Sequence, residues 1–180
     1  EIEGTLQEKN NRVRFPLLFK GKYRRIILLG GFLAVFQQWC GINVVFNYAE
    51  EVFAAAGYEV SAMLLNVVIT GVVNLIFTLV AIRTVDRWGR RRLMLMGSLG
   101  LALLYGVLGF SYLMNLEGKI ILVIVLLCIA VYGMTLAPVT WVVLSEIFPN
   151  RVRGVAMAVA TTMLWVASSL LVLSFPYLNR

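Results

Sequence analysis

Residues 26–49 read IILLGGFLAVFQQWCGINVVFNYA, an apolar run that also carries the carboxamides of Gln37, Gln38, Asn43 and Asn47. A run of about 20 such residues spans a bilayer as a helix. Amides at that depth are costly unless they face protein, water or a ligand. In one unbroken helix these amides would cover more than half of the circumference, so a helix break near Gly41 is predicted. Polar groups at a broken membrane helix are typical of substrate sites in transporters, and amides that merely join helices are the alternative.

Further apolar runs indicate that the chain is an all-α membrane protein. Hydrophobic residues make up 61% of it and charged residues 14%, against about 25% charged residues in soluble domains. About five membrane-spanning helices are predicted, at residues 26–49, 60–82, 93–115, 120–144 and 154–178. Residues 1–25 are expected to be a cytoplasmic linker with a short amphipathic helix, and residues 26–180 a transmembrane bundle.

The basic residues lie in alternate loops. Of the Lys and Arg residues, seven lie in 9–25 and five in 83–92, with two more at Arg151 and Arg153. This is the positive-inside pattern of a multi-pass protein, and it places these three segments in the cytoplasm. Basic residues spread in this way do not form one face for nucleic acid. We therefore expect a cell-membrane protein surrounded by lipid, with no nucleic-acid partner.

Two more spans carry polar or helix-distorting residues. Asn66, Thr70 and Asn74 recur every fourth residue and must face the interior of the bundle. Asn74 is expected to contact substrate, with a helix–helix hydrogen bond as the alternative. Pro138 is expected to kink its helix, and Trp141 is placed to stack on a sugar ring or to lie in the interfacial aromatic belt.

The polar residues of the spans carry no net charge and form no metal motif. The chain has no His, and its two Cys residues, Cys40 and Cys128, lack a CxxC partner. No cofactor or metal is therefore expected, and no enzyme. Neutral donors and acceptors at membrane depth suit a neutral polyhydroxylated solute, which indicates a sugar.

Two of the cytoplasmic loops place acidic residues before arginines. Residues 86–92 read DRWGRRR and residues 145–154 read SEIFPNRVRG. Loops of this kind on one membrane face can form ion pairs in one conformation and lose them in another. Positive-inside topology alone is the simpler explanation.

At these positions the chain resembles the sugar porter family of the major facilitator superfamily. The shared elements are QQxxGIN at 37–43, DRxGRR at 86–91, PxxW at 138–141 and SEIFPxxxRG at 145–154. The resemblance covers nearly the whole chain and implies a partial C-terminal six-helix bundle, equivalent to helices seven to eleven, whose N-terminal transporter half is missing. It looks closest to bacterial xylose or hexose proton symporters and to facilitative glucose carriers.

The resemblance also implies roles for individual residues. The sugar-contacting positions would be Gln37, Gln38, Asn43, Asn74 and Trp141. The gating positions would be Asn47, Tyr48, Gly133, Pro138, Asp86, Arg90, Arg91, Glu146 and Arg153. The chain departs from the family at Asn47-Tyr48, where paired tyrosines are usual, and at Leu164, where an amide precedes the tryptophan.

The expected function is transport of a monosaccharide, xylose or a hexose, by alternating access and with proton symport. A sugar sensor built like a transporter remains the alternative. An intramembrane enzyme is disfavoured, because it would need ionisable groups at membrane depth. A multidrug exporter is disfavoured too, because it would need a more aromatic cavity.

Overall fold

The computed structural model describes residues 21–48, Ala54 and residues 60–178, and every structural statement below refers to these residues. Of the expected linker at residues 1–25, only residues 21–25 are described, and residues 22–25 begin the first described helix. The rest of the linker, with its expected short helix, lies outside the described part of the chain. The described helices are, in order, α2 (Lys22–Trp39), α3 (Ile42–Asn47), α5 (Val60–Trp88), α6 (Arg90–Leu113), α7 (Gly118–Met134), α8 (Leu136–Ile147) and α9 (Arg153–Leu178). No strand occurs among the described residues.

The predicted spans are confirmed as helices, and two of them are broken. Four stretches are long and apolar enough to cross a bilayer: Leu64–Trp88, Arg90–Leu113, Gly118–Ile147 and Arg153–Tyr177. The third of these comprises α7 and α8. The remaining predicted span, residues 26–49, is the broken pair α2 and α3.

The first break lies where the sequence predicts it, at Gly41. This glycine has φ 80° and ψ 0°, in the left-handed region that a residue without a Cβ adopts readily. The N–H of Gly41 donates to the carbonyl of Gln38 at 3.1 Å, which tightens the last turn of α2. The backbone N–H groups of Val44 and Val45 then donate to the carbonyl of Gly41 and begin α3.

The second break lies at Thr135, with φ −121° and ψ −82°, three residues before the proline to which the sequence attributes a kink. Pro138 has no N–H to donate to the carbonyl of Met134, so α7 ends at Met134. Pro138 itself occupies the first turn of α8, where a missing N–H costs little. The kink is thus confirmed, and its position follows from the hydrogen bond that the proline removes.

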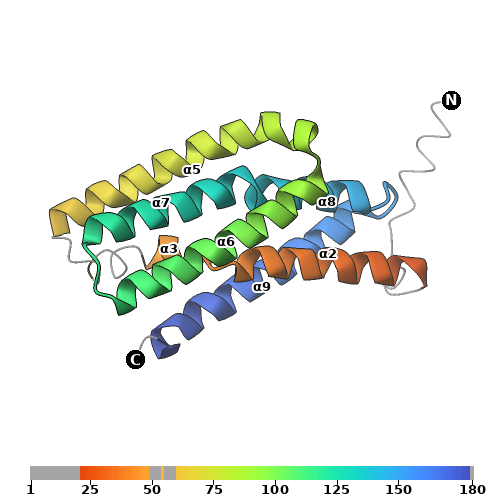
Figure 1. Ribbon diagram of the computed structural model, residues 1–180. Helices are drawn as coiled ribbons and strands as arrows, with labels where there is room; N and C mark the ends of the chain where they lie inside the picture. The colour runs from red at the N-terminus through yellow and green to blue at the C-terminus, as the bar shows by residue number, and fades with distance from the viewer. Residues whose placement is uncertain (1–20, 49–53, 55–59, 179–180) are drawn as a thin grey trace.

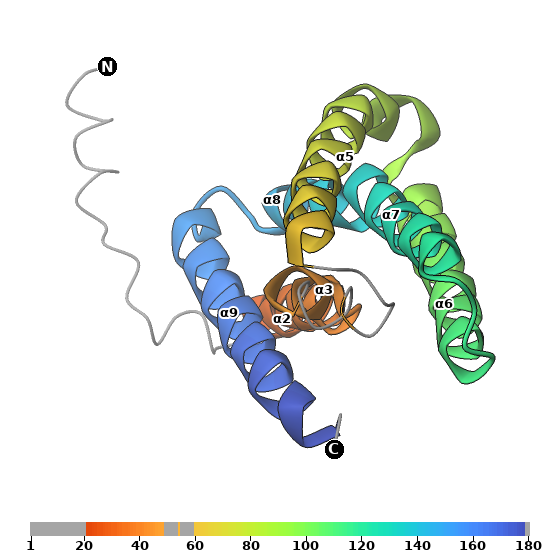
Figure 2. The same ribbon diagram turned by 90° about the vertical axis from the view of Figure 1, so that its left-hand side faces the viewer.

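The helices form two layers that α8 connects (Figures 1 and 2). α5 and α6 both pack against α7, and α2 packs along α9. Small residues allow the second contact, because Ala34 of α2 and Ala156 and Ala160 of α9 are almost fully buried. A Cβ on Gly30 of α2 would come within 2.4 Å of the Phe148 ring, so that position also needs a glycine.

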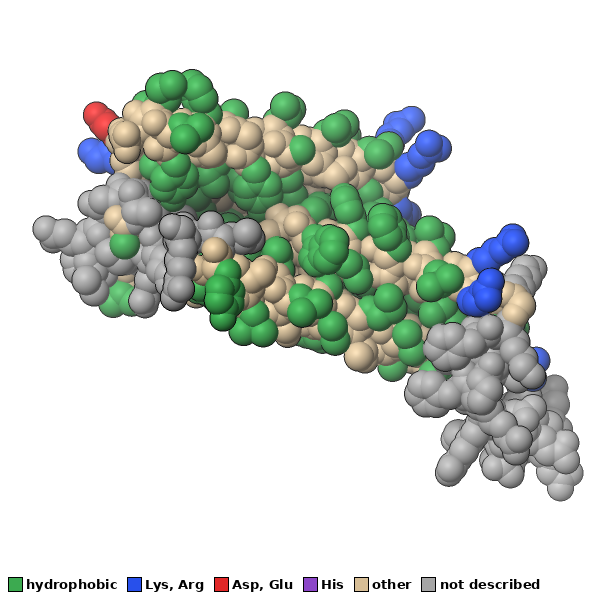
Figure 3. All heavy atoms as spheres, turned by 90° about the horizontal axis from the view of Figure 1, so that it is seen from below, with side chains coloured by type: hydrophobic (Ala, Val, Ile, Leu, Met, Phe, Trp, Pro, Cys, Tyr) green, Lys and Arg blue, Asp and Glu red, His purple; other side chains and the backbone are tan. Residues whose placement is uncertain are grey.

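The outer surface has the distribution of side chains that a membrane protein needs. Large apolar side chains such as Leu103 and Leu173 are 72% and 68% exposed, and apolar atoms cover much of the face in Figure 3. Most of the Lys and Arg side chains on that face gather at one end. At this end α2, α6 and α9 begin and α5 and α8 end (Figure 1), so the described basic residues at 24–25, 83–92 and 151–153 share one side of the bundle, as the positive-inside pattern predicts.

Candidate substrate-binding site

Three of the predicted site residues, Gln37, Gln38 and Asn43, lie next to the break between α2 and α3. Gln37 and Gln38, near the end of α2, are 3% and 6% exposed. Asn43, in the first turn of α3, donates from Nδ2 to Oε1 of Gln38 and, at 3.0 Å, to the hydroxyl of Ser168 on α9. Neutral amides thus join α2, α3 and α9 in the interior of the bundle.

Gln37 faces the opposite way, toward α7. Its Nε2 donates to the hydroxyl of Tyr132 at 2.5 Å. Its Oε1 is buried and has no hydrogen-bond partner among the described residues. A buried acceptor without a partner is unusual in a folded protein and indicates that a water or a ligand group supplies the missing hydrogen bond.

Asn74 of α5 lies against the end of α7. A Cβ on Gly133 would be 3.0 Å from Oδ1 of Asn74, so a side chain at this position would crowd the asparagine. Oδ1 of Asn74 is the second buried amide oxygen in this region without a partner. Since Gly133 follows Tyr132 in sequence, Asn74 and Gln37 approach α7 at neighbouring residues.

The rest of the polar stripe on α5 faces inward, as expected. Asn66 and Thr70 are 4% and 1% exposed. The hydroxyl of Thr70 donates to the carbonyl of Asn66 and that of Thr78 to the carbonyl of Asn74, each at 2.7 Å. Each threonine hydroxyl thus has a hydrogen-bond partner on the backbone of α5, and it does not occupy the asparagine side chains.

Trp141 lies on α8, and Asn47 and Tyr48 lie at the end of α3. Trp141 of α8 is 38% exposed, and no hydrogen bond or ring contact joins it to another described residue. Asn47 donates from Nδ2 to the carbonyl of Asn43 at 2.7 Å. The hydroxyl of Tyr48 donates to the carbonyl of Val172 at 2.9 Å, and its ring lies 4.7 Å from that of Phe175, which fastens the end of α3 to α9.

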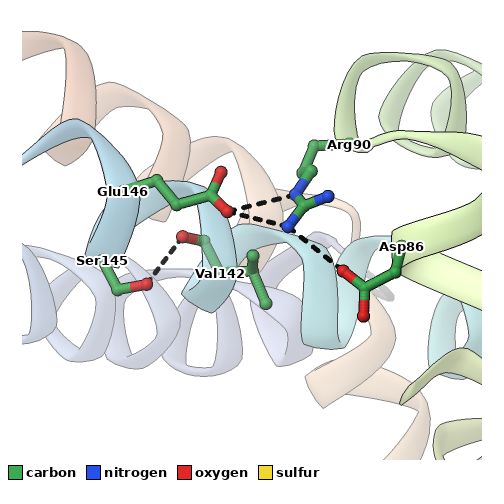
Figure 4. Close-up of polar contacts among 5 residues, drawn as sticks. All are labelled: Asp86, Arg90, Val142, Ser145 and Glu146. Atoms are coloured by element: carbon green, nitrogen blue, oxygen red, sulfur yellow. Dashed lines mark hydrogen bonds and ion pairs between the residues drawn. The ribbon is translucent and has the colours of Figure 1, made fainter. Parts of the chain in front are cut away.

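Charged residues at the basic end of the bundle form a second site, centred on Arg90 (Figure 4). Nη2 of Arg90 lies 2.9 Å from Oε1 of Glu146 at the end of α8 and 3.2 Å from Oδ1 of Asp86 at the end of α5. Nε of Arg90 also donates to Glu146, at 3.2 Å. Of the two adjacent arginines expected at gating positions, Arg90 and Arg91, Arg90 pairs with Glu146.

The other two predicted members of the charged cluster make different contacts. Arg91 is exposed and forms no ion pair with a described residue. Arg153 donates from Nε to the carbonyl of Phe148 at 3.3 Å and caps the end of α8. The ion-pair network among the described residues is therefore Asp86–Arg90–Glu146.

Tyr132 is the site residue that the sequence alone did not indicate. The one available signal was a hydroxyl within the apolar run of α7, directly before Gly133. Whether such a hydroxyl faces lipid or another helix depends on the rotation of the helix, which the local sequence does not determine.

One open groove, of about 440 Å³, lies along α9 and not at the amides. Its lining residues are Thr161, Thr162, Trp165, Val166, Ser169 and Leu170. The hydroxyls of Thr162 and Ser169 donate to carbonyls of their own helix. The groove thus presents mostly apolar groups, and the buried amides are better suited to a polyhydroxylated ligand. No group of three or more potential metal ligands occurs in the part of the chain described, and its two cysteines are free thiols.

Discontinuous membrane helices with neutral polar groups at their breaks define a class: multi-pass proteins built like secondary transporters. The chain belongs to the Sugar (and other) transporter family, whose sequence profile matches residues 1–180. The family assignment confirms the resemblance drawn from the four sequence elements.

Named relatives agree with the assignment. The chain is 42% identical to the D-xylose-proton symporter of Escherichia coli over 155 residues, which is 86% of this chain and 32% of the relative. It is 45% identical to the glucose facilitated diffusion protein of Zymomonas mobilis, over 81% of this chain and 31% of the relative. The chain thus spans about a third of the length of these relatives.

Solved structures confirm the fold. The structure described as the major facilitator superfamily proton:xylose symporter XylE bound to 6-bromo-6-deoxy-D-glucose superimposes with a TM-score of 0.80 at 37% identity, over 98% of this chain and 38% of that one. The inward open conformation of the xylose transporter XylE from E. coli gives a TM-score of 0.76. The chain is therefore an all-α membrane protein with part of a major facilitator fold.

Proposed function

We propose that this chain is part of a secondary transporter that carries a monosaccharide across the cell membrane by alternating access. The observation that carries the proposal is the buried amide cluster at the α2–α3 break, with the free acceptor oxygens of Gln37 and Asn74 beside it. Sugar hydroxyls are the donors that such oxygens lack. Neutral amides bind such groups without supplying acid–base chemistry, which favours a carrier over an enzyme.

In this proposal Gln37, Gln38, Asn43 and Asn74 contact the sugar. The breaks at Gly41 and Thr135 allow α3 and α8 to move relative to α2 and α7. Trp141 is on the moving segment α8, where a shift of that helix would bring its ring toward the amides. Asn47 and Tyr48 are on the other moving segment, α3, and would take part in opening and closing the opposite side.

The Asp86–Arg90–Glu146 network is proposed to hold the cytoplasmic ends of α5, α6 and α8 together in one of the two states. Arg91 and Arg153 would add positive charge near Glu146. Exposed pairs of this kind contribute only about 0–1 kcal/mol each. Such a contribution is enough to bias two conformations of similar energy.

We further propose that the rest of the transporter completes the binding site. A substrate site at the interface of two halves needs both halves, and this chain spans about a third of its relatives. Relatives are named both proton symporters and a facilitated diffusion protein, and we favour proton symport. A coupling acid would have to lie outside the amide cluster, which contains none.

Reconstitution of the complete transporter in liposomes tests this function. Uptake of labelled xylose, glucose and arabinose is measured with and without an inward proton gradient. Saturable, stereospecific uptake that the gradient accelerates is the expected result. Binding of a sugar without uptake would favour the sensor alternative, and the absence of both would contradict the proposed function.

A further inference from the structure

The hydrogen bond between Gln37 and Tyr132 joins two equivalent places in the fold. Gln37 is the third-last residue of α2, and Tyr132 is the third-last residue of α7. Each helix then breaks, at Gly41 and at Thr135. The two side chains are 3% and 8% exposed, so their contact lies inside the bundle at the level of both breaks.

In the structure, Tyr132 holds the nitrogen end of the Gln37 carboxamide. The last torsion of a glutamine side chain is soft, so a free amide would rotate and present either its oxygen or its nitrogen. Here Nε2 donates to the Tyr132 hydroxyl. The oxygen is therefore the group left over, and it is buried without a partner among the described residues. An acceptor held in this way favours a ligand group that donates a hydrogen bond.

A packing role alone does not account for the hydroxyl of Tyr132. Tyr105 of α6 packs against the same apolar cluster, and its hydroxyl is buried without a partner in the described structure. This hydroxyl lies at the α2–α3 break, 4.0 Å from the position of a Cβ on Gly41, and is a second open polar group there. What distinguishes Tyr132 is the side chain that its hydroxyl engages.

We propose that Tyr132 is a positioning residue that sets sugar selectivity, because it holds Gln37 so that Oε1 accepts a hydrogen bond from one particular sugar hydroxyl. This inference rests on the proposed function. It predicts a site that discriminates at one ring position between a hydroxyl and any group that cannot donate. Movement at the α2–α3 or α7–α8 break would bring the sugar to this oxygen.

The test measures equilibrium binding to the complete transporter of the transported sugar, its monodeoxy analogues and its deoxyfluoro analogues. A fluorine cannot donate a hydrogen bond, so at one ring position both analogues should bind about 3- to 10-fold more weakly than the parent sugar. Tyr132→Phe should weaken binding of the parent sugar by a similar factor. The dissociation constants of the parent sugar and of that deoxy analogue should then be nearly equal. In a Gln37→Ala background, Tyr132→Phe should have no further effect.

Tyr23→Phe is the matched control, since it removes a tyrosine hydroxyl from the start of α2, in a different apolar cluster and far from the break. It should leave every ratio unchanged. The proposal is overturned if Tyr132→Phe keeps the wild-type ratios, if both phenylalanine variants act alike, or if the deoxyfluoro analogue binds as well as the parent sugar. A wild-type transporter that binds no monosaccharide would instead overturn the proposed function, and the sugar-orienting role with it.

Discussion

At the scale of single residues, the candidate site depends on amides and on glycines. In the proposed site, amides with one end bonded, such as Gln37, leave the other end for a ligand. Glycines without a Cβ allow neighbouring groups to approach closely, as Gly133 does for Asn74 and Gly97 for Thr135. Both kinds lead to predictions that a substitution can test.

Gln38→Ala should weaken sugar binding by about 1–3 kcal/mol in the complete transporter, because a substrate hydroxyl loses a buried partner. Asn43 should stay ordered, since it retains its bond to Ser168. Isothermal titration calorimetry measures the change. Thr84→Ala is the control, since that hydroxyl is exposed and bonds only within α5, away from both the amides and the α9 groove. An unchanged dissociation constant in a folded Gln38→Ala variant would leave Gln38 as a helix–helix contact.

Gly97→Ala should lower stability by about 1–3 kcal/mol, the usual cost of overpacking. The added methyl would lie 2.2 Å from Oγ1 and 2.6 Å from Cβ of Thr135, so α6 would have to move away from the α7–α8 junction. Thermal unfolding in detergent measures the effect. Gly106→Ala on the same helix meets nothing within 4 Å and should be neutral or slightly stabilising. Equal melting temperatures for the two variants would contradict the close packing at Thr135.

At the scale of helices, local sequence produces the two breaks at which we propose that α3 and α8 move. Gly41 supplies a left-handed residue, and Pro138 removes a backbone hydrogen bond one turn upstream. The segments after the breaks, α3 and α8, are held by side-chain contacts at their far ends. Tyr48 attaches α3 to α9, and Glu146 attaches α8 to Arg90.

Glu146→Gln should shift the complete transporter toward the inward-open state without unfolding it. The substitution removes a carboxylate that Arg90 pairs at 2.9 Å, and loss of up to about 1 kcal/mol changes a two-state ratio by up to about fivefold. Distances between spin labels on the two halves report the populations. Arg90→Ala should have the same effect and Arg91→Ala little, because Arg91 is exposed and pairs with no described acid. Unchanged populations for both Glu146→Gln and Arg90→Ala would mean that these charges only set the orientation of the helices in the membrane.

Much of this arrangement is predictable from sequence, for identifiable physical reasons. Apolar run lengths predict the spans, and the width of the polar arc predicts the break at Gly41. The break near Pro138 is displaced to Thr135 because a proline acts on the carbonyl four residues earlier. Pairings such as Gln37 with Tyr132 and Asn43 with Ser168 are 95 and 125 residues apart in sequence. They depend on the rotation of packed helices, which no local pattern determines.

At the scale of the whole molecule, the bundle has an apolar surface and one strongly basic end (Figure 3). In the proposed transporter, lipid would cover part of that surface. In the proposed transporter, the rest of the polypeptide covers another part and closes the sugar site from the opposite side. Residues of α9 such as Trp165, which lines the open groove, provide an alternative place for a ligand.

The most direct test of the central claim is a density map of the complete transporter with its sugar bound at saturating concentration. The account predicts density for one monosaccharide beside the α2–α3 break, within hydrogen-bonding distance of the amides of Gln37 and Gln38. Sugar density in the α9 groove beside Trp165, with both amides still enclosed by protein, would contradict it.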